Sequence, residues 1–437
     1  MVKIVLVSVG SRGDVQPYCI LGQALAARGH DVMIATEQRL ESLVVDEFKL
    51  PFRRIVGDIC SGFFDPEHQR RLRAAKFFEA LEIVSNWNSE FDPRAILNSY
   101  EAAVREADVV VSGVMSVTET YCLAEKYNVP WIPIFLGTVV LPTSAYPHWI
   151  FEDLMPSFLG CCLNRMTYSI IFRKMWQKQQ VYINPWRVEV LKLPPIKASM
   201  GLLGKLTDSK SITVYQACSL LLASPTRDLP HDYPPGKVDY VGYLFPSAES
   251  ATVSPTLQAF LSASPDVPVI YIGFGSMPTL DPDQLFQLVV DLCRKANCRA
   301  VLVSGWSSLA DMPSSDLVCV ESSAPHAWLF PKMKCLIHHC GIGTTGAALR
   351  SGVPQIPCPI LYDQFHNAKK MVALGVALSQ VLPKEMTSDR LAADVKAVLR
   401  NDSHVQDKAK QYGAYVENES LNSVAKLCDA IEAAKPF

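Results

Sequence analysis

One order of segments recurs along this chain: a short buried strand, a glycine-containing turn and an amphipathic helix. The first half contains it twice, over residues 3–9, 18–30 and 31–36 and again over residues 107–113, 117–129 and 130–137. Strands that are apolar throughout and alternate with helices are typical of a parallel sheet covered by helices on both faces. The order therefore predicts an α/β fold built on doubly wound parallel sheets.

The same order restarts in the second half, after residues 243–256, which are mostly small or polar and predict a linker. Strands are expected over residues 267–277, 299–306, 317–322, 334–339 and 354–360, with helices over 279–296 and 344–352. Because 437 residues exceed what one core usually organises, we expect two domains, residues 1–242 and 257–437. Two such domains would leave a cleft at the carboxyl ends of their strands, where open α/β sheets bind ligands.

An aromatic-rich insertion is expected over residues 142–195, late in the first domain. Aromatic side chains commonly fill cores, so ordinary helix packing is one interpretation. The other is an apolar acceptor pocket that opens toward a membrane surface, with Arg173, Lys174 and Lys178 facing lipid headgroups. A solvated helix face explains these three cations equally well. The residues predicted to line that pocket and bind the acceptor are Tyr146, His148, Trp149, Phe172 and Trp176.

Composition excludes some classes of protein. A formal net charge of −2 without a long basic run argues against nucleic-acid binding. The 13 cysteines form no C-x-x-C pair, which favours buried reduced thiols and a cytoplasmic protein. We expect neither a signal peptide nor a spanning helix. The mean hydropathy of +0.14 is slightly high, which suggests an apolar ligand or an apolar surface, and peripheral contact with a membrane is one interpretation of such a surface.

The segment HHCGIGTTG, residues 338–346, contains the G-x-G-x-x-G spacing of dinucleotide-binding turns. Asp363 lies about 20 residues downstream, as in that fingerprint, but it opens the next helix instead of ending a strand. An NAD-dependent oxidoreductase therefore stays an alternative. Glycines before a helix start favour a phosphate in either case, because unpaired N–H groups and the helix dipole attract anions.

The segment Asp281-Pro-Asp283 has two interpretations, a metal-binding pair or the start of a helix. An acid, a proline and a second acid before an apolar periodic run are what a helix N-terminus needs. We therefore expect capping and no metal site, so that protein groups neutralise an anionic leaving group.

Residues 10–17, GSRGDVQP, are expected to form a loop at the carboxyl end of the first strand. Asp14 there either caps the following helix or serves as a general base, with Ser11 and Arg12 holding oxygen-rich groups. In the second domain, His339 can donate to a phosphate. Asp363 with Gln364 suits the hydroxyls of a sugar, because together they accept and donate hydrogen bonds.

Several segments in this order resemble the GT-B nucleotide-sugar glycosyltransferases, and most closely the sterol 3-beta-glucosyltransferases. Bacterial glycopeptide and macrolide glycosyltransferases come next. The segments are GSRGDVQP, GFGSM, PHAWLFPKM, HHCGIGTTGAALRSGVP and DQFHNAKKMVALGVA, with AYPHWI and QVYINPWR resembling the sterol enzymes in particular. The resemblance covers nearly the whole chain. It implies two Rossmann-like domains, with a UDP-sugar bound mainly by the second and the acceptor mainly by the first.

By the same resemblance, Asp14 would be the catalytic base in an inverting, metal-independent transfer of a hexose, with glucose as the family's usual sugar. The donor would be held by residues that match the family's motifs: Ser11, Arg12, Ser276, Trp306, Ala324, His326, His339, Gly341, Gly343, Thr344, Thr345, Asp363 and Gln364. The chain departs from the family's usual HHGGAGTTG at Cys340 and Ile342, which should tighten the phosphate turn.

The resemblance implies no cofactor beyond the UDP-sugar as co-substrate, and a hydrophobic hydroxyl-bearing acceptor such as a sterol, terpenoid or lipid alcohol. A polyketide- or macrolide-like acceptor is the alternative within the family. Outside this activity, an NAD-dependent oxidoreductase, a UDP-sugar epimerase of the same fold and an inactive lipid-binding protein stay open.

Overall fold

The computed structural model describes residues 1–63, 65–75, 79, 82–83, 91–137, 141–152, 160–209, 211–224, 228–246, 253–275, 281–305 and 314–436. The chain divides into two compact units. The first comprises residues 1–59, 87–244 and 419–437, and the second residues 60–86 and 245–418.

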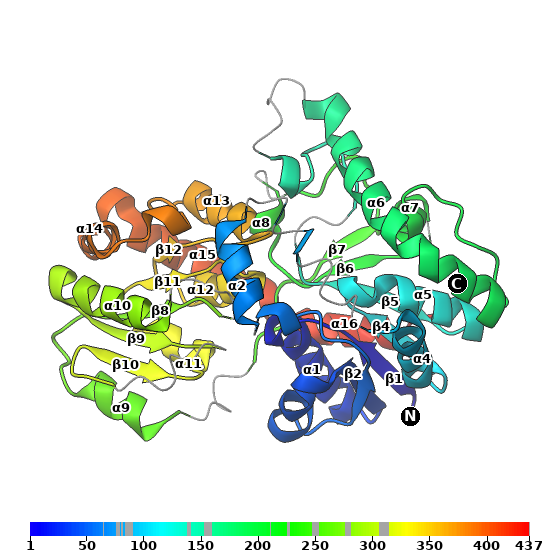
Figure 1. Ribbon diagram of the computed structural model, residues 1–437, viewed down its shortest axis with the longest axis horizontal. Helices are drawn as coiled ribbons and strands as arrows, with labels where there is room; N and C mark the ends of the chain where they lie inside the picture. The colour runs from blue at the N-terminus through cyan, green and yellow to red at the C-terminus, as the bar shows by residue number, and fades with distance from the viewer. Residues whose placement is uncertain are drawn as a thin grey trace. The chain divides into compact units, whose positions relative to one another are not determined.

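A seven-stranded, fully parallel sheet in the order β3-β2-β1-β4-β5-β6-β7 forms the centre of the first unit. Its strands are β1 (Lys3–Val7), β2 (Asp31–Glu37), β3 (Phe52–Ile55), β4 (Val109–Ser112), β5 (Trp131–Phe135), β6 (Val214–Gln216) and β7 (Val238–Tyr240). Its main helices are α1 (Arg12–Ala27), α4 (Pro93–Val104), α5 (Val117–Tyr127), α6 (Gly160–Pro185), α7 (Gly201–Asp208), α8 (Leu220–Ala223) and α16 (Ser423–Glu432) (Figure 1).

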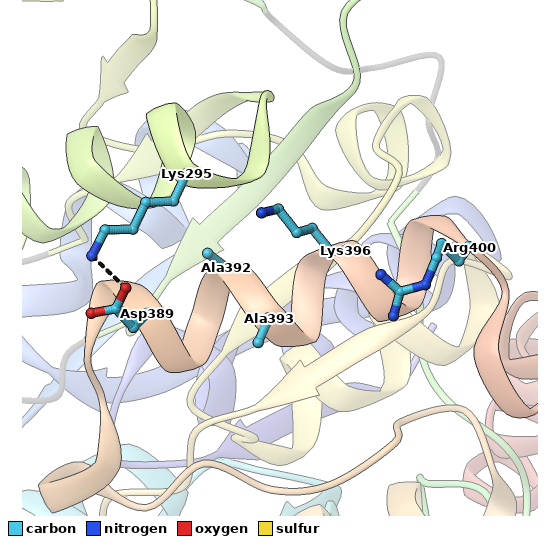
Figure 2. Close-up of a pocket in the computed structure, with 6 residues that line it drawn as sticks. All are labelled: Lys295, Asp389, Ala392, Ala393, Lys396 and Arg400. Carbon is cyan, nitrogen blue, oxygen red and sulfur yellow. Dashed lines mark ion pairs between the residues drawn. The ribbon is translucent and has the colours of Figure 1, made fainter.

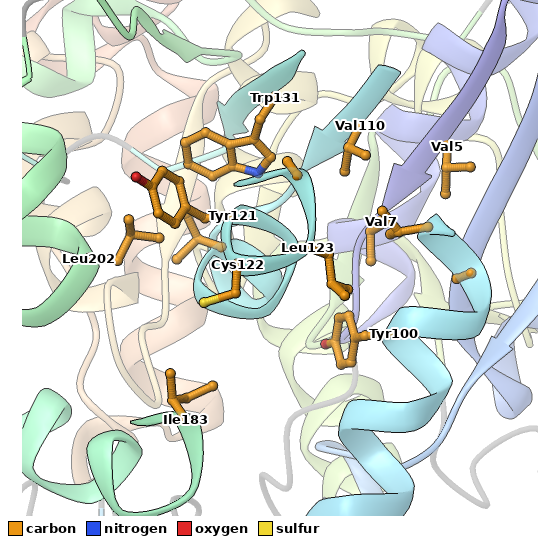
Figure 3. Packing of buried hydrophobic residues seen from close by; sticks show 14 of the residues in the cluster. Val5, Val7, Tyr100, Val110, Tyr121, Cys122, Leu123, Trp131, Ile183 and Leu202 are labelled. Carbon is orange, nitrogen blue, oxygen red and sulfur yellow. The ribbon is translucent and has the colours of Figure 1, made fainter. Parts of the chain in front are cut away.

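Both faces of this sheet are buried. One face packs against α4, α5, α6 and α7, where Tyr121 and Trp131 meet edge to face at 5.3 Å between ring centroids (Figure 3). The other face packs against α1 and α16. Side chains from the alternating positions of β1, Val5 and Ile4, enter opposite cores. This two-sided burial explains why the central strands β1, β4 and β5 are almost entirely apolar.

The second unit has a five-stranded parallel sheet in the order β10-β9-β8-β11-β12. Its strands are β8 (Val269–Gly273), β9 (Arg299–Val303), β10 (Val318–Glu321), β11 (Leu336–His338) and β12 (Gln355–Pro357). Its helices are α2 (Pro66–Ala74), α9 (Pro255–Ser262), α10 (Pro282–Ala296), α11 (His326–Leu329), α12 (Ile342–Arg350), α13 (Gln364–Leu374) and α14 (Ser388–Leu399), with most of α15 (Val405–Ser420). The two sheets confirm the predicted α/β class.

The assignment of residues 257–437 to the second domain is wrong at its end. Helix α16 belongs to the first unit, where Leu427, Cys428 and Ile431 are buried against α1 and β1 (Figure 1). Arg28 at the end of α1 also pairs with Asp429 at 2.6 Å. The helix covers an apolar sheet face that would otherwise contact water, and its position in the chain does not reveal this.

One local expectation also needs correction, and two strands were missed. Residues 10–17 are not a loop, because α1 already begins at Arg12. Residues 220–223 form the short helix α8, and the strands β6 and β7 on either side of it were not predicted from the sequence. Capping at residues 281–283 is confirmed, since the Asp281 carboxylate accepts the N–H of Asp283 at 3.1 Å and Pro282 opens α10.

Candidate active site

Asp14 sits in the first turn of α1, directly after the carboxyl end of β1. Ser11 precedes the helix and donates both its backbone N–H and its hydroxyl to Oδ2 of Asp14, each at 2.8 Å. Within the described part of the chain, Oδ1 of Asp14 receives no hydrogen bond. The carboxylate therefore has one oxygen fixed and one available, and the capping and base interpretations are compatible.

Burial raises the pKa of the Asp14 carboxyl above its ordinary value, while the bonds from Ser11 and the charge of Arg39 oppose the rise. A carboxylate with a raised pKa is a better proton acceptor for a hydroxyl than an exposed one. Arg12 faces elsewhere: it forms a bidentate pair with Glu47 at 2.7 and 2.6 Å on the exposed surface.

Gly10 allows the backbone to turn tightly against Asp14. Its φ is +132°, and a Cβ at this position would lie 2.6 Å from Oδ2 of Asp14. Two charged side chains hold this peptide: Glu37 accepts the N–H of Gly10 at 3.3 Å, and Arg39 donates to the Gly10 carbonyl at 2.9 Å. Arg39 is itself anchored on the Asp58 carboxylate at 3.1 Å. The position of Asp14 thus depends on side chains that the sequence analysis missed.

In the second unit, β11 delivers two histidines with different environments. His338 is fully buried; its Nδ1 accepts the N–H of Cys340 at 3.1 Å, so Nε2 carries the proton and donates to Gln355 at 2.9 Å. His338 is therefore a structural residue. Burial lowers the pKa of His339 to about 3, helped by His338 and opposed by the Gly273 carbonyl. His339 is thus a neutral imidazole that can donate an N–H.

The ring of His339 lies against two glycines. A Cβ on Gly275 would approach Cε1 of the ring to 2.9 Å, and one on Gly341 would approach Nε2 to 2.6 Å. Gly341 precedes α12, whose first N–H groups have no intrahelical partner. A neutral N–H donor and the start of a nine-residue helix therefore lie together, as an anion site needs.

The three donor residues predicted in α12 differ in access. Gly343 is exposed and has nothing within 4 Å of a built Cβ, and Thr344 is partly buried. Thr345 is fully buried, and its hydroxyl has no partner among the described residues. A phosphate would therefore reach Gly343 and Thr344 first.

Asp363 and Gln364 open α13, but their side chains have different roles. Oε1 of Gln364 accepts the N–H groups of Ile360 and Leu361 at 2.9 and 3.0 Å, so this amide oxygen holds the preceding loop. The Asp363 carboxylate accepts an amide N–H of the buried Asn367 at 3.1 Å.

The region predicted for the nucleoside is described only in part. Ala324 is partly buried, and His326 stacks on Phe330 at 4.3 Å and lies 3.2 Å from the Tyr271 hydroxyl. Gly273 lies under that hydroxyl, since a Cβ there would be 2.1 Å away. Ser276 and Trp306, also predicted to contact the donor, lie outside the described residues.

Four of the five predicted acceptor residues lie in one region of the first unit. His148 packs against Trp149 at 5.4 Å and Phe172 at 6.2 Å between ring centroids. Tyr146 is partly buried beside Tyr233, and burial raises the pKa of its hydroxyl. Trp176 instead belongs to the large core under α7, where it fills the space beside Gly201. For Trp176 the packing interpretation holds.

A surface hollow of about 430 Å³ lies between α10 and α14, lined by Lys295, Asp389, Lys396 and Arg400 (Figure 2). Lys295 pairs with Asp389 at 2.7 Å, and Arg400 pairs with Asp402 at 2.7 Å. None of the predicted donor residues lines this hollow, and its cations are largely neutralised. We do not assign it to the active site.

Two known domains match the chain. Residues 4–140 match the glycosyltransferase family 28 N-terminal domain, and residues 305–430 match the C-terminal domain of erythromycin biosynthesis protein CIII-like proteins. The sterol 3-beta-glucosyltransferase of Komagataella phaffii is 30% identical over 440 residues, which cover 98% of this chain and 34% of that protein. The chain thus contains a match to a glycosyltransferase family 28 N-terminal domain and is similar over nearly its whole length to sterol 3-beta-glucosyltransferases.

Solved structures of the GT-B family agree in fold. The glycotransferase of kitacinnamycin superposes with a TM-score of 0.68 at 21% identity, covering 99% of this chain and 98% of its own. The Streptomyces sp. SF2575 glycosyltransferase SsfS6, complexed with thymidine diphosphate, superposes with a TM-score of 0.59 at 16% identity, covering 98% and 100%. The predicted resemblance and the GT-B fold are thus confirmed. This chain spans about a third of the length of the curated relatives it matches.

Proposed function

We propose that this chain is an inverting glycosyltransferase that moves a hexose, glucose by preference, from a UDP-sugar to a hydroxyl of a hydrophobic acceptor such as a sterol, a terpenoid or a lipid alcohol. The observation that carries the proposal is the environment of the Asp14 carboxylate, in a chain similar to sterol 3-beta-glucosyltransferases. Its carboxylate has a raised pKa, one oxygen held by Ser11 and one oxygen open.

In this mechanism the acceptor hydroxyl gives its proton to Asp14 as its oxygen attacks the anomeric carbon, and UDP leaves from the opposite face of the sugar. Negative charge develops on the leaving diphosphate. The N–H of the neutral His339 and the free N–H groups at the start of α12 would offset that charge. Asp363, held by Asn367, would accept hydrogen bonds from the hexose hydroxyls.

Two similar proteins support this choice of donor and acceptor. The Komagataella protein is a sterol 3-beta-glucosyltransferase, and SsfS6 was solved with a nucleoside diphosphate. His148, Trp149 and Phe172 pack together as an aromatic group in the first unit, the unit to which the acceptor is assigned. A polyketide- or macrolide-like acceptor is the second candidate, because residues 305–430 match the C-terminal domain of erythromycin biosynthesis protein CIII-like proteins.

A direct test incubates the purified protein with a panel of UDP-sugars and lipid alcohols and identifies the products by mass. We expect one UDP-sugar and a sterol-like alcohol to give a product heavier by one hexose residue. Thermal shifts with UDP and with NAD provide a separate readout of the donor site, and we expect UDP alone to stabilise. Stabilisation by NAD without any glycoside product would contradict the proposal.

A further inference from the structure

Helix α6 has an unusual charge pattern. Over its 26 residues it carries no acidic side chain but four basic ones, Arg165, Arg173, Lys174 and Lys178. Arg165 pairs with Asp232 at 3.4 Å, and the side chains of Arg173, Lys174 and Lys178 are exposed. A surface helix usually mixes charges of both signs, so a purely cationic exposed face points to an anionic partner.

The same exposed face is also apolar. Met166, Ile170 and Val181 are 53%, 47% and 70% exposed. Steps of four and eleven residues return a helix to within about 40° of the same direction, so these three side chains form one stripe. The opposite side of α6 already buries Tyr168 and Phe172 in the unit. A helix that is apolar on both sides is normally covered on both sides.

Two further features extend this stripe. Val188 and Val190, in the turn that follows α6, are 48% and 52% exposed. Beside α6 lies a hollow of about 500 Å³. It is lined by Arg173, Trp176, Gln177 and Gln180 and by residues 196–199, which include Lys197. Two cations, two amides and the edge of an indole suit the phosphate and glycerol parts of a lipid headgroup.

We propose that the exposed face of α6, defined by Met166, Ile170, Arg173, Lys174 and Val181, docks on an anionic lipid surface. Apolar side chains would enter the headgroup boundary while the flanking cations contact phosphates, the arrangement of interfacial helices. Charge complementarity selects this partner. A second copy docking through the same face would bring two acid-free cationic surfaces together, and repulsion would oppose that contact. No helix in the described part of the chain is both long and apolar enough to cross a bilayer.

Vesicle co-sedimentation of the whole chain without any substrate tests this proposal independently of the transfer activity. We expect binding to phosphatidylcholine vesicles that contain phosphatidylserine, weakened by salt, and little binding to phosphatidylcholine alone. The double variant Arg173→Glu/Lys174→Glu should lower the partition coefficient at least about tenfold. The variant Ile170→Ser/Val181→Ser should lower it by a similar factor.

Matched control variants change similar exposed side chains elsewhere in the first unit. Arg54→Glu/Lys126→Glu controls for charge, and Val45→Ser/Leu421→Ser controls for apolar surface; both should bind vesicles as the wild type does. Thermal unfolding checks that all four variants fold. Equal losses in control and α6 variants would overturn the proposal. So would a wild-type chain that ignores phosphatidylserine but changes from dimer to monomer when α6 is altered, because a second copy would then be the partner.

Discussion

Asn367 joins the two parts of the donor half-site: its amide donates one N–H to the Asp363 carboxylate at 3.1 Å and the other to the Cys340 carbonyl at 2.9 Å. Asn367 is fully buried, so its amide group is shielded from water. Asp363, which is expected to bind the sugar, is thereby fixed relative to the turn at Cys340, which is expected to bind the phosphate.

Replacing Asn367 with Ala should remove one hydrogen bond to the Asp363 carboxylate. Buried hydrogen bonds of this kind are worth about 1–3 kcal/mol when one partner is removed, so stability should fall by that amount. We expect the KM for the UDP-sugar to rise about tenfold with a smaller change in kcat, since positioning of the donor is lost. Gln287→Ala, which removes an exposed amide–carboxylate bond to Asp291, is the matched control. Unchanged donor KM in the Asn367 variant would refute the link.

Replacing Asp14 with Asn should keep the fold, because the amide oxygen can still accept both hydrogen bonds from Ser11. Loss of the general base should lower kcat at least about 100-fold. The exposed Asp46→Asn serves as a control and should retain full activity. Near-normal turnover in the Asp14 variant would move the role of base to another residue.

The pH dependence of the wild-type rate gives a second test of Asp14. Its carboxylate is the active form, and burial raises the pKa of that carboxyl. Activity should therefore fall as pH drops through the raised pKa, at a higher pH than for an ordinary aspartate. A rate that stays constant down to the ordinary pKa range of Asp would argue against this environment.

The buried carboxyl of Glu119, in α5, should make the stability of the protein depend on pH. It is 7% exposed, Oε2 has no partner among the described residues, and burial raises the pKa of its carboxyl to about 7. Between its ordinary pKa of 4.5 and about 7, the folded state binds more protons than the unfolded state. The free energy of unfolding should therefore fall as pH rises through that window.

Glu119→Gln removes this titration and should flatten the slope. At pH 8 the variant should be more stable than the wild type by about 1–3 kcal/mol in urea unfolding, because it buries no charge. The exposed Glu106→Gln is the control and should leave the slope unchanged. If the free energy of unfolding of the Glu119 variant depends on pH as steeply as that of the wild type, the Glu119 carboxyl is not the source of this dependence.

Cys340 adopts φ +69° at a position where glycine would be unstrained, and its Sγ is fully buried. Cys340→Gly and Cys340→Ala both remove the sulfur, but only glycine relieves the left-handed conformation. We expect the Gly variant to be more stable than the Ala variant by about 1 kcal/mol, measured by the midpoint of denaturant unfolding. Equal midpoints would mean that the turn is not strained at this residue.

Most strands could be predicted because they are continuous apolar runs, and such runs are required when both faces of a sheet are covered. The strands that were missed are β3, which contains Arg53 and Arg54, and the three-residue strands β6 and β7. The helix start at Asp281 was equally readable, since its cap is local. The start of α1 was not, because Gly10, Gly13 and Pro17 resemble a loop, whereas the Ser11–Asp14 capping interaction begins the helix before the proline.

Within the candidate site, sequence reasoning identified residues near glycine turns but missed those that act through distant contacts. Glu37 and Arg39 hold Gly10 across 27 and 29 positions of the chain, and nothing in their local sequence signals this. Likewise, periodicity does not reveal which aromatic residues of α6 enter the core, so Trp176 was grouped with Phe172. The predicted cleft between the domains and the roles of the site residues stay predictions.

The return of the chain to the first unit through α16 has a consequence for dissecting the protein. Severing the polypeptide after residue 242 would strip one side of the larger sheet and uncover Leu21, Leu25 and their neighbours, which Leu427 and Ile431 now shield. The remaining piece would carry an apolar helix with nothing to cover. The first unit thus requires the last helix of the chain to cover its sheet, so exchanging the second unit between relatives requires that α16 stay with the first unit.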